Sequence, residues 1–308
     1  MNPAIAMDRV VKSYEGKPAL KGISLAVREG GCFGLLGPNG AGKSTSMKIL
    51  TGLLEPDRGA ARVFGRDVRR DGAEIRRQIG YVPQAITLYE KLSAYDNLVF
   101  FGEMYGVRGG QLKKRIGEVL AQVGLADRAK DAVEKFSGGM KRRVNIAAAL
   151  LHRPRLIIMD EPTVGIDPQS RNHIFEMIRS LRREGATVLY STHYMEEVEA
   201  LCDELAIVDR GEVIAQGELG DVLDRYGARA VYLELQEGGT PPPLPAGFGK
   251  PVPKERGWLI ETPRPLEALT AWAAACEAGS AGVKRLEIVR PSLESVFLSL
   301  TGTSLRDN

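Results

Sequence analysis

The 308-residue sequence lacks most of the features that mark membrane-spanning, secreted or nucleic-acid-binding proteins. It has no apolar run close to the roughly 20 residues that a transmembrane helix needs. The start of the chain carries Asp8 and Arg9 and lacks the apolar core of a signal peptide. The formal net charge is only +3, so the composition gives no electrostatic reason to expect nucleic acid as a partner.

Cysteine is also scarce. The three cysteines, Cys32, Cys202 and Cys276, lie far apart in the sequence and show no metal-ligand spacing. We therefore expect reduced thiols in a cytoplasmic protein. If such a chain serves a membrane process, it must do so by docking onto another chain, as a peripheral protein on the inner face of the cell membrane.

Most of the chain alternates short apolar strands with amphipathic helices. Over residues 1–220 this pattern predicts an α/β domain with a mainly parallel sheet, in which 156–159 and 187–190 are the clearest buried strands. The strand pattern disappears between about 85 and 135, where apolar residues recur at helical spacing. We therefore expect a helical insert over about 85–150 within this domain.

The remaining residues, 221–308, have a different character. Six prolines fall between Pro241 and Pro253 and predict a proline-rich loop over 238–253. Strand-like and helical segments flank this loop and predict a small α+β accessory domain. These segments are the strand-like 230–236, 258–262 and 283–289 and the helical 266–277 and 292–300.

A glycine-rich segment matches the pattern G-x-x-x-x-G-K-[ST], and it follows a predicted strand and precedes a predicted helix. Backbone N–H groups in such a loop point at phosphate oxygens, and the helix N-terminus adds a partial positive charge. Lys43 is the expected partner of the β- and γ-phosphates, and the Ser44 hydroxyl the expected Mg²⁺ ligand. The predicted phosphate-binding residues are Gly37, Pro38, Asn39, Gly40, Ala41, Gly42, Lys43, Ser44 and Thr45.

Two carboxylates follow the buried strand 156–159. The carboxyl ends of strands in α/β sheets are where ligands are held, and Asp160 and Glu161 stand at such an end. Asp160 is expected to hold Mg²⁺, as the acidic strand residue does in P-loop NTPases. Glu161 is expected to polarise the attacking water as a general base.

The segment Ser137-Gly138-Gly139-Met140-Lys141 begins a predicted helix a short distance before Glu161. A serine followed by two glycines at a helix start leaves N–H groups free to bind an anion. Together with the phosphate loop, this segment resembles the signature motif of the ABC ATPase family. The resemblance implies a P-loop NTPase fold and ATP as the nucleotide. It also implies that Ser137, Gly138 and Gly139 contact the γ-phosphate bound to a second copy of the chain.

Other residues match the family in order along the chain, and the resemblance spans about 4–220. Tyr14 resembles the aromatic residue that stacks on adenine, and Gln84 resembles the glutamine that reaches Mg²⁺ and the attacking water. Asp167 lies in a segment that resembles the loop crossing the dimer interface. His193 resembles the switch histidine that contacts the γ-phosphate.

Two positions depart from the usual family pattern. Met140 stands where the signature usually has glutamine, so any hydrogen bond from that amide to the ribose is absent or replaced. Because Ser137-Gly138-Gly139 is retained, we expect hydrolysis to survive. Ile166 replaces a leucine in the crossing loop, which is a volume-conserving change of small effect.

The segment Pro291-Ser292-Leu293-Glu294-Ser295-Val296-Phe297-Leu298 narrows the resemblance further. It resembles the C-terminal segment found in ATPase subunits of bacterial drug and daunorubicin-type exporters, whose permease is a separate polypeptide. The resemblance implies an exporter subunit that closes as an ATP-bound dimer, with its helical insert against cytoplasmic loops of a transmembrane permease. Substrate choice would then lie in the permease.

Other functions fit the sequence less well. An importer ATPase remains the main alternative within the transporter class. Soluble ABC ATPases of translation usually carry two cassettes in one chain, and those of DNA repair carry long coiled coils, for which no sustained heptads occur here. A P-loop kinase would not need the Ser-Gly-Gly element. A GTPase would need an Asn-Lys-x-Asp motif, which is absent.

Overall fold

The computed structural model describes residues 3–236, 239–245, 247–279 and 281–302. These residues form two compact units, with the boundary between Leu219 and Gly220. Each unit has a hydrophobic core of its own. The first unit holds two sheets and most of the helices, and the second holds one small sheet with helices.

A six-stranded sheet forms the centre of the first unit, in the order β10-β9-β3-β8-β7-β6. The five strands from β9 to β6 are parallel, and β10 pairs antiparallel with β9. Strands β3, β7 and β8 are buried along their whole length, which explains why they read as continuous apolar runs. The predicted α/β fold class is confirmed. The strands are β3 (Cys32–Leu36), β6 (Ile79–Val82), β7 (Leu156–Asp160), β8 (Thr187–Thr192), β9 (Glu204–Asp209) and β10 (Glu212–Glu218).

A second, antiparallel sheet in this unit was not predicted. Its order is β2-β1-β4-β5, with β1 (Ile5–Tyr14), β2 (Lys17–Val27), β4 (Arg58–Val63) and β5 (Arg66–Asp67). Buried residues of β1, β2 and β4 share one core with residues of β3 and α1. Register shifts interrupt the pairing of β1, and Arg9 has a φ of 46°. These irregularities break the alternation of apolar and polar residues that would reveal a strand.

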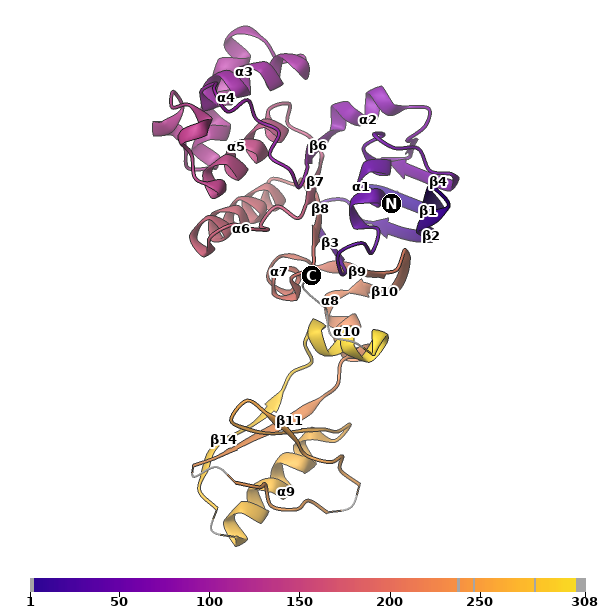
Figure 1. The fold of residues 1–308 in the computed structure, drawn as a ribbon, viewed down its shortest axis with the longest axis vertical. Helices are drawn as coiled ribbons and strands as arrows, with labels where there is room; N and C mark the ends of the chain where they lie inside the picture. The colour runs from indigo at the N-terminus through magenta and orange to yellow at the C-terminus, as the bar shows by residue number, and fades with distance from the viewer. Residues whose placement is uncertain (1–2, 237–238, 246, 280, 303–308) are drawn as a thin grey trace. The chain divides into compact units, whose positions relative to one another are not determined.

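The helical insert predicted over about 85–150 contains α3 (Ala94–Met104), α4 (Gly109–Gln122) and α5 (Gly138–Leu150). Figure 1 shows these helices grouped on one side of the central strands, with α1 and the antiparallel sheet on the other. No helix of the described part of the chain is long and apolar enough to cross a membrane. The other helices of this unit are α1 (Lys43–Leu50), α2 (Gly72–Gln78), α6 (Pro168–Arg183) and α7 (Met195–Leu201).

The second unit is built around Trp272, whose side chain is 0% exposed. Its sheet has the order β12-β13-β11-β14 and is antiparallel throughout. The indole N–H of Trp272 donates to the Pro242 carbonyl at 3.2 Å, which fixes the proline-rich loop to the core. The elements are α8 (Leu219–Tyr226), β11 (Ala230–Leu235), β12 (Val252–Lys254), β13 (Gly257–Glu261), α9 (Pro265–Ala278), β14 (Val283–Val289) and α10 (Leu293–Thr301).

Strand β12 corrects one boundary of the sequence analysis. It begins at Val252, inside the range 238–253 that the prolines assigned to a loop. Pro253 is tolerated there because β12 is an edge strand, where a missing N–H does not break a ladder. Residues 238 and 246 of that range lie outside the described residues.

All three cysteines are buried. Cys32 at the start of β3 and Cys202 at the end of α7 are distant in sequence, yet their sulfur atoms lie 3.5 Å apart. The contact with Cys32, together with burial, raises the pKa of the Cys202 thiol well above its usual value. Burial also raises the pKa of the Cys276 thiol.

We expect Trp272→Ala to lower the free energy of unfolding of the second unit by about 3–5 kcal/mol, because it empties the centre of that core. Chemical denaturation followed by circular dichroism measures the change. Leu266→Ala on the same helix is the matched control, since Leu266 is 68% exposed and its loss should cost less than about 0.5 kcal/mol. Equal stability of the two variants would contradict the proposed core.

Candidate functional site

The predicted phosphate loop joins the end of β3 to the start of α1. Gly42, the last residue before α1, has a φ of 109°. A Cβ atom there would lie 2.9 Å from the Ala19 carbonyl oxygen and 2.6 Å from Leu20 Cδ2. Only glycine fits this combination of backbone conformation and close packing. The loop is thus shaped by steric constraints before any ligand is considered.

A cavity of about 450 Å³ opens over this loop. It contains most of the residues predicted to bind phosphate, together with two predicted catalytic residues. Ala19, which belongs to none of the sequence motifs, also lines it. The lining residues are Ala19, Asn39, Gly40, Ala41, Gly42, Lys43, Ser44, Thr45, Gln84 and Glu161.

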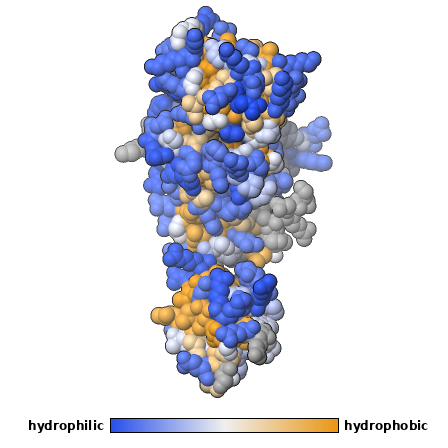
Figure 2. Space-filling view, turned by 90° about the vertical axis from the view of Figure 1, so that its left-hand side faces the viewer, coloured by the Kyte–Doolittle hydropathy of each residue, from blue (hydrophilic) through white to orange (hydrophobic). Residues whose placement is uncertain are grey.

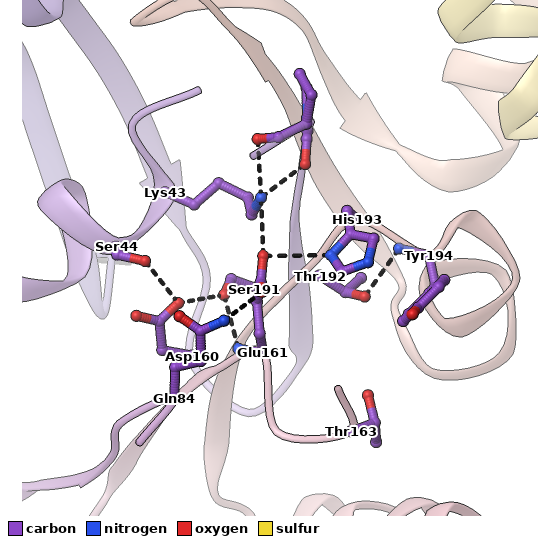
Figure 3. Close-up of polar contacts among 12 residues, drawn as sticks. Lys43, Ser44, Gln84, Asp160, Glu161, Thr163, Ser191, Thr192, His193 and Tyr194 are labelled. Carbon is purple, nitrogen blue, oxygen red and sulfur yellow. Dashed lines mark hydrogen bonds and ion pairs between the residues drawn. The ribbon is translucent and has the colours of Figure 1, made fainter. Parts of the chain in front are cut away.

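Lys43 is 4% exposed, and its ammonium group is held by oxygen atoms on two sides (Figure 3). Nζ donates to the carbonyl oxygens of Gly37 at 2.7 Å and Pro38 at 3.1 Å. It also forms an ion pair with Glu161 Oε1 at 3.1 Å. Because both partners are buried, this attraction is screened far less than a surface pair would be. The ammonium group lies across the loop, between the loop carbonyls and the Glu161 carboxylate.

Glu161 contacts the other two predicted catalytic residues, Gln84 and His193 (Figure 3). Its carboxylate accepts a hydrogen bond from Gln84 Nε2 at 3.0 Å, and it lies 3.4 Å from His193 Nδ1. Its backbone has a φ of 45°, a conformation that costs a non-glycine residue about 1–3 kcal/mol. The backbone N–H donates to Ser191 Oγ at 3.1 Å, which helps to hold this turn. Segments far apart in the sequence therefore meet at one buried carboxylate.

Asp160 and Ser44, two of the predicted metal ligands, also meet. The Ser44 hydroxyl donates to Asp160 Oδ1 at 3.1 Å, beside the cavity. A hydroxyl, a carboxylate and the amide of Gln84 form a set of hard ligands of the kind that Mg²⁺ takes together with substrate phosphates. The described residues contain no group of three His, Cys, Asp or Glu side chains arranged to hold a metal ion.

Ser191 is a site residue to which the sequence analysis gave no role. Its hydroxyl donates to Asp160 Oδ1 at 2.8 Å and accepts from the Glu161 N–H. Asp160 and Ser191 are paired in register on the neighbouring parallel strands β7 and β8. Both strand ends were visible in the sequence, but their adjacency in the sheet was not. Knowledge of the strand order would have been enough to find this contact.

A second buried carboxylate supports the same region. Glu197 on α7 is 0% exposed and accepts hydrogen bonds from the hydroxyls of Thr163, Tyr190 and Thr192 at 2.7–2.9 Å. Thr163 follows Glu161 by two residues, and Thr192 immediately precedes His193. The network therefore connects the turn at Glu161 to the end of β8. Nothing in the sequence distinguished Glu197 from the other acidic residues of this helix.

The predicted signature residues do not line the cavity of their own chain. Ser137 caps α5, with Oγ accepting the Met140 N–H at 3.2 Å, and Ser137 and Gly138 are exposed. Asp167 caps α6 by accepting the Ser170 N–H at 2.8 Å. The hydrogen bonds from Ser170 hold the pKa of the Asp167 carboxyl below its ordinary value. The start of α5 is thus exposed at Ser137 and Gly138 and lies outside the cavity of its own chain.

Tyr14 lies at the end of β1 and is 46% exposed. It is not among the residues that line the cavity. The stacking of Tyr14 on adenine therefore stays a prediction. An exposed aromatic ring at a strand end is free to contact a flat ligand.

The sequence matches known proteins over nearly its whole length. The protein family described as "ABC transporter" matches residues 20–164. The linearmycin resistance ATP-binding protein LnrL of Bacillus subtilis is 44% identical over 97% of this chain and 99% of its own length. The daunorubicin/doxorubicin resistance ATP-binding protein DrrA of Streptomyces peucetius is 36% identical over 97% of this chain and 92% of its own length.

Solved structures resemble the fold. The ATP-binding subunit of an ABC transporter superposes with a TM-score of 0.66 and 33% identity, covering 72% of this chain and 93% of that one. A dimeric ATP-binding cassette in a post-hydrolysis state, bound to ADP and Pi, gives a TM-score of 0.65 and 28% identity, covering 70% of this chain and 98% of that one.

The start of α5 yields a prediction that does not depend on any ligand. A Cβ atom on Gly139 would lie 2.1 Å from Ser170 Oγ and 2.5 Å from Ser170 Cβ, whereas one on Gly138 would meet nothing within 4 Å. We expect Gly139→Ala to lower the free energy of unfolding by about 1–3 kcal/mol through overpacking against α6. Gly138→Ala is the control and should leave stability nearly unchanged in chemical denaturation. A smaller loss for Gly139→Ala than for Gly138→Ala would show this packing to be wrong.

Proposed function

Since this chain belongs to the family of ABC transporter ATP-binding proteins, we propose that it binds and hydrolyses ATP to drive export through a separate membrane permease. The observation that carries the proposal is the convergence of Lys43, Gln84 and His193 on the Glu161 carboxylate at the edge of the phosphate-loop cavity. Residues 1–220 carry this chemistry, and 221–308 form the accessory domain.

The contacts give each residue a role in hydrolysis. Lys43 turns from Glu161 to the β- and γ-phosphates when ATP enters the loop, because a polyphosphate offers it more negative charge than one carboxylate. This frees Glu161 to polarise the attacking water as the general base. His193 and Gln84 both lie beside the Glu161 carboxylate. From there His193 would contact the γ-phosphate, and Gln84 would orient the water through its amide.

Ser44, Asp160 and Gln84 are the residues that would hold Mg²⁺ beside the phosphates. The bound ion would neutralise charge that develops on the phosphate oxygens. Asp160 is prepared for this role because Ser44 and Ser191 orient its carboxylate from two sides. Tyr81 stays neutral nearby, since burial and the charge of Asp160 raise its pKa to about 12.

The functional unit that we propose is a dimer of two copies. The signature residues Ser137, Gly138 and Gly139 lie outside the cavity of their own chain, and the first two are exposed. A second copy, arranged head to tail, would place its signature against the γ-phosphate in this cavity, with Asp167 at the crossing loop. The ADP-bound cassette to which this chain is similar is itself dimeric, which supports a dimer as the functional unit.

Two observations support coupling to a permease, namely the printed names of the relatives and an exposed apolar surface on the helical insert. LnrL and DrrA are resistance proteins by name. A further relative is the Nod factor export ATP-binding protein I of Ralstonia nicotianae, which is 37% identical over 99% of this chain and 96% of its own length. Large apolar side chains are exposed on the helical insert, and Figure 2 shows apolar surface among the polar residues there. This surface suits the cytoplasmic loops of a permease on the inner face of the cell membrane. Its exposed residues are Tyr89, Leu92, Phe100, Met104 and Tyr105.

The first test is Glu161→Gln. We expect this variant to bind Mg-ATP, to lose turnover by roughly 10²- to 10⁴-fold because the general base is gone, and to accumulate as an ATP-bound dimer. Steady-state phosphate release measures turnover, and light scattering with and without Mg-ATP measures the dimer. Glu176→Gln is the matched control, since Glu176 is an exposed carboxylate on α6 away from the cavity. Turnover at the wild-type rate in Glu161→Gln would overturn the assignment of the base.

A second test addresses the permease. Met104→Glu places a charge on a side chain of α3 that is 69% exposed, and we expect it to reduce the fraction of the chain recovered with membranes after cell fractionation. The ATPase activity of the purified chain should stay unchanged, because Met104 is not part of the cavity. Leu53→Glu is the control, since Leu53 is 64% exposed but lies outside the insert. Equal membrane recovery of both variants would exclude this surface as the docking site.

A further inference from the structure

Positive charge is concentrated in one short stretch of the first unit, residues 62–77. This stretch carries six arginines and three carboxylates, so its formal charge is +3, which equals the net charge of the whole chain. The other residues taken together are therefore neutral. We call the six side chains the arginine patch, which consists of Arg62, Arg66, Arg69, Arg70, Arg76 and Arg77.

The arginine patch lies at the surface, on elements that follow one another directly. It begins on β4 and β5, continues through the turn after β5 and ends on α2. Ala61 and Val63 on β4 and Ile75 on α2 are buried in the core, so the residues beside them turn outward. All six arginines are exposed as a result.

The three carboxylates of the stretch do not pair with these arginines. Asp67 Oδ1 accepts the Arg69 backbone N–H at 2.9 Å, and Asp71 Oδ2 accepts the Asp67 backbone N–H at 3.0 Å. Both carboxylates thus hold the backbone of the turn. No ion pair among the described residues includes a patch arginine, whereas Arg155, outside the patch, pairs with Glu29 at 3.0 Å.

Like charges at this density repel one another, and the repulsion lowers stability unless an anion compensates it. Guanidinium groups suit phosphate in particular, because their planar forks donate two parallel hydrogen bonds to its oxygens. One small phosphate would engage only one or two arginines, whereas the patch extends over two strands, a turn and a helix. The chemistry therefore fits an extended surface of phosphate groups.

We propose that the arginine patch binds the anionic phospholipid headgroups of the inner leaflet of the cell membrane. The inference deepens the proposed function, which places the chain beneath a permease on that face. This leaflet is negatively charged and attracts basic segments that come within a Debye length, about 8 Å at physiological salt. Figure 1 shows α2 and the insert helix α3 at the same end of the first unit, away from α7 and β9. A chain docked through its insert can therefore meet the surrounding lipid with α2 and the turn before it.

Nucleic acid is the main competing anion. Sequence-tolerant binding of single strands uses exposed aromatic rings on which bases stack. The only aromatic residue of 62–77 is Phe64, and the Arg155 guanidinium lies over its ring, 4.1 Å from the centroid. The sequence pI of 8.7 is also below the value of about 9 that marks basic nucleic-acid-binding domains. Both observations favour lipid.

The test uses the full purified chain and phospholipid vesicles that contain no permease. Four patch arginines whose side chains make no polar contact among the described residues are changed together to glutamine, namely Arg62, Arg66, Arg70 and Arg77. We expect the parent to sediment with vesicles of phosphatidylethanolamine and phosphatidylglycerol, and not with vesicles of phosphatidylcholine. The variant should bind the anionic vesicles at least about tenfold more weakly, since each basic residue near an anionic leaflet contributes on the order of fivefold. Raising the salt from about 0.1 to 0.5 M should release the parent, because screening shortens the reach of the attraction.

The matched control removes the same charge from exposed residues of the insert, by changing Arg108, Lys113, Lys114 and Lys130 to glutamine. It should bind like the parent, and lysine at the four patch positions should retain most of the binding because the charge is kept. Equal losses in the patch and control variants, or equal binding of the parent to both kinds of vesicle, would refute the inference. Tighter patch-dependent binding to duplex DNA than to the anionic vesicles, at the same salt, would assign the patch to nucleic acid instead.

ATP hydrolysis separates this inference from the proposed function. No patch arginine lines the phosphate-loop cavity, so the glutamine variant should release phosphate from ATP at the parent rate. Normal ATPase activity in a parent that does not bind anionic vesicles would refute the lipid contact alone. A parent that binds these vesicles through the patch but hydrolyses no ATP would contradict the proposed function and support the lipid contact.

Discussion

The ion pair between Lys43 and Glu161 is the contact on which the arrangement of the site depends. It joins the phosphate loop to the end of β7, where both side chains are almost wholly shielded from solvent. Leaving either charge alone would be costly, so the surrounding groups are placed to share them. The loop carbonyls surround Lys43, and Gln84 and His193 approach Glu161. The unfavourable backbone conformation of Glu161 is maintained because the pair and Ser191 hold it from both sides.

The site is assembled by a sheet whose strand order differs from the order of the sequence. Strands β3, β8 and β7 are neighbours, although more than a hundred residues separate β3 from β7 along the chain. Their carboxyl ends meet at one edge, which is where parallel sheets gather functional groups. The insert interrupts the chain between β6 and β7 and ends in α5. The same insertion therefore supplies both the candidate permease surface and the helix that Ser137 caps.

The sequence predicted the central parts of the fold and the site because motifs of fixed spacing carry them. The phosphate loop, the acidic end of β7 and the helix that starts after Ser137 all lie where their patterns placed them. Contacts made by residues without a motif could not be foreseen. Ser191 and Glu197 act through partners that only the strand order and helix packing bring near. The antiparallel sheet was missed because its bulges disturb the period-two pattern.

The burial of the three cysteines has a practical consequence for spectroscopy. Because Cys32, Cys202 and Cys276 are shielded, and the thiol pKa of the latter two is raised, the natural chain presents little thiolate to an alkylating dye. A single cysteine introduced on the surface could then be labelled selectively without first removing the native ones. Distance measurements by fluorescence transfer between two such labelled copies would follow opening and closing of the proposed dimer in an otherwise unaltered protein.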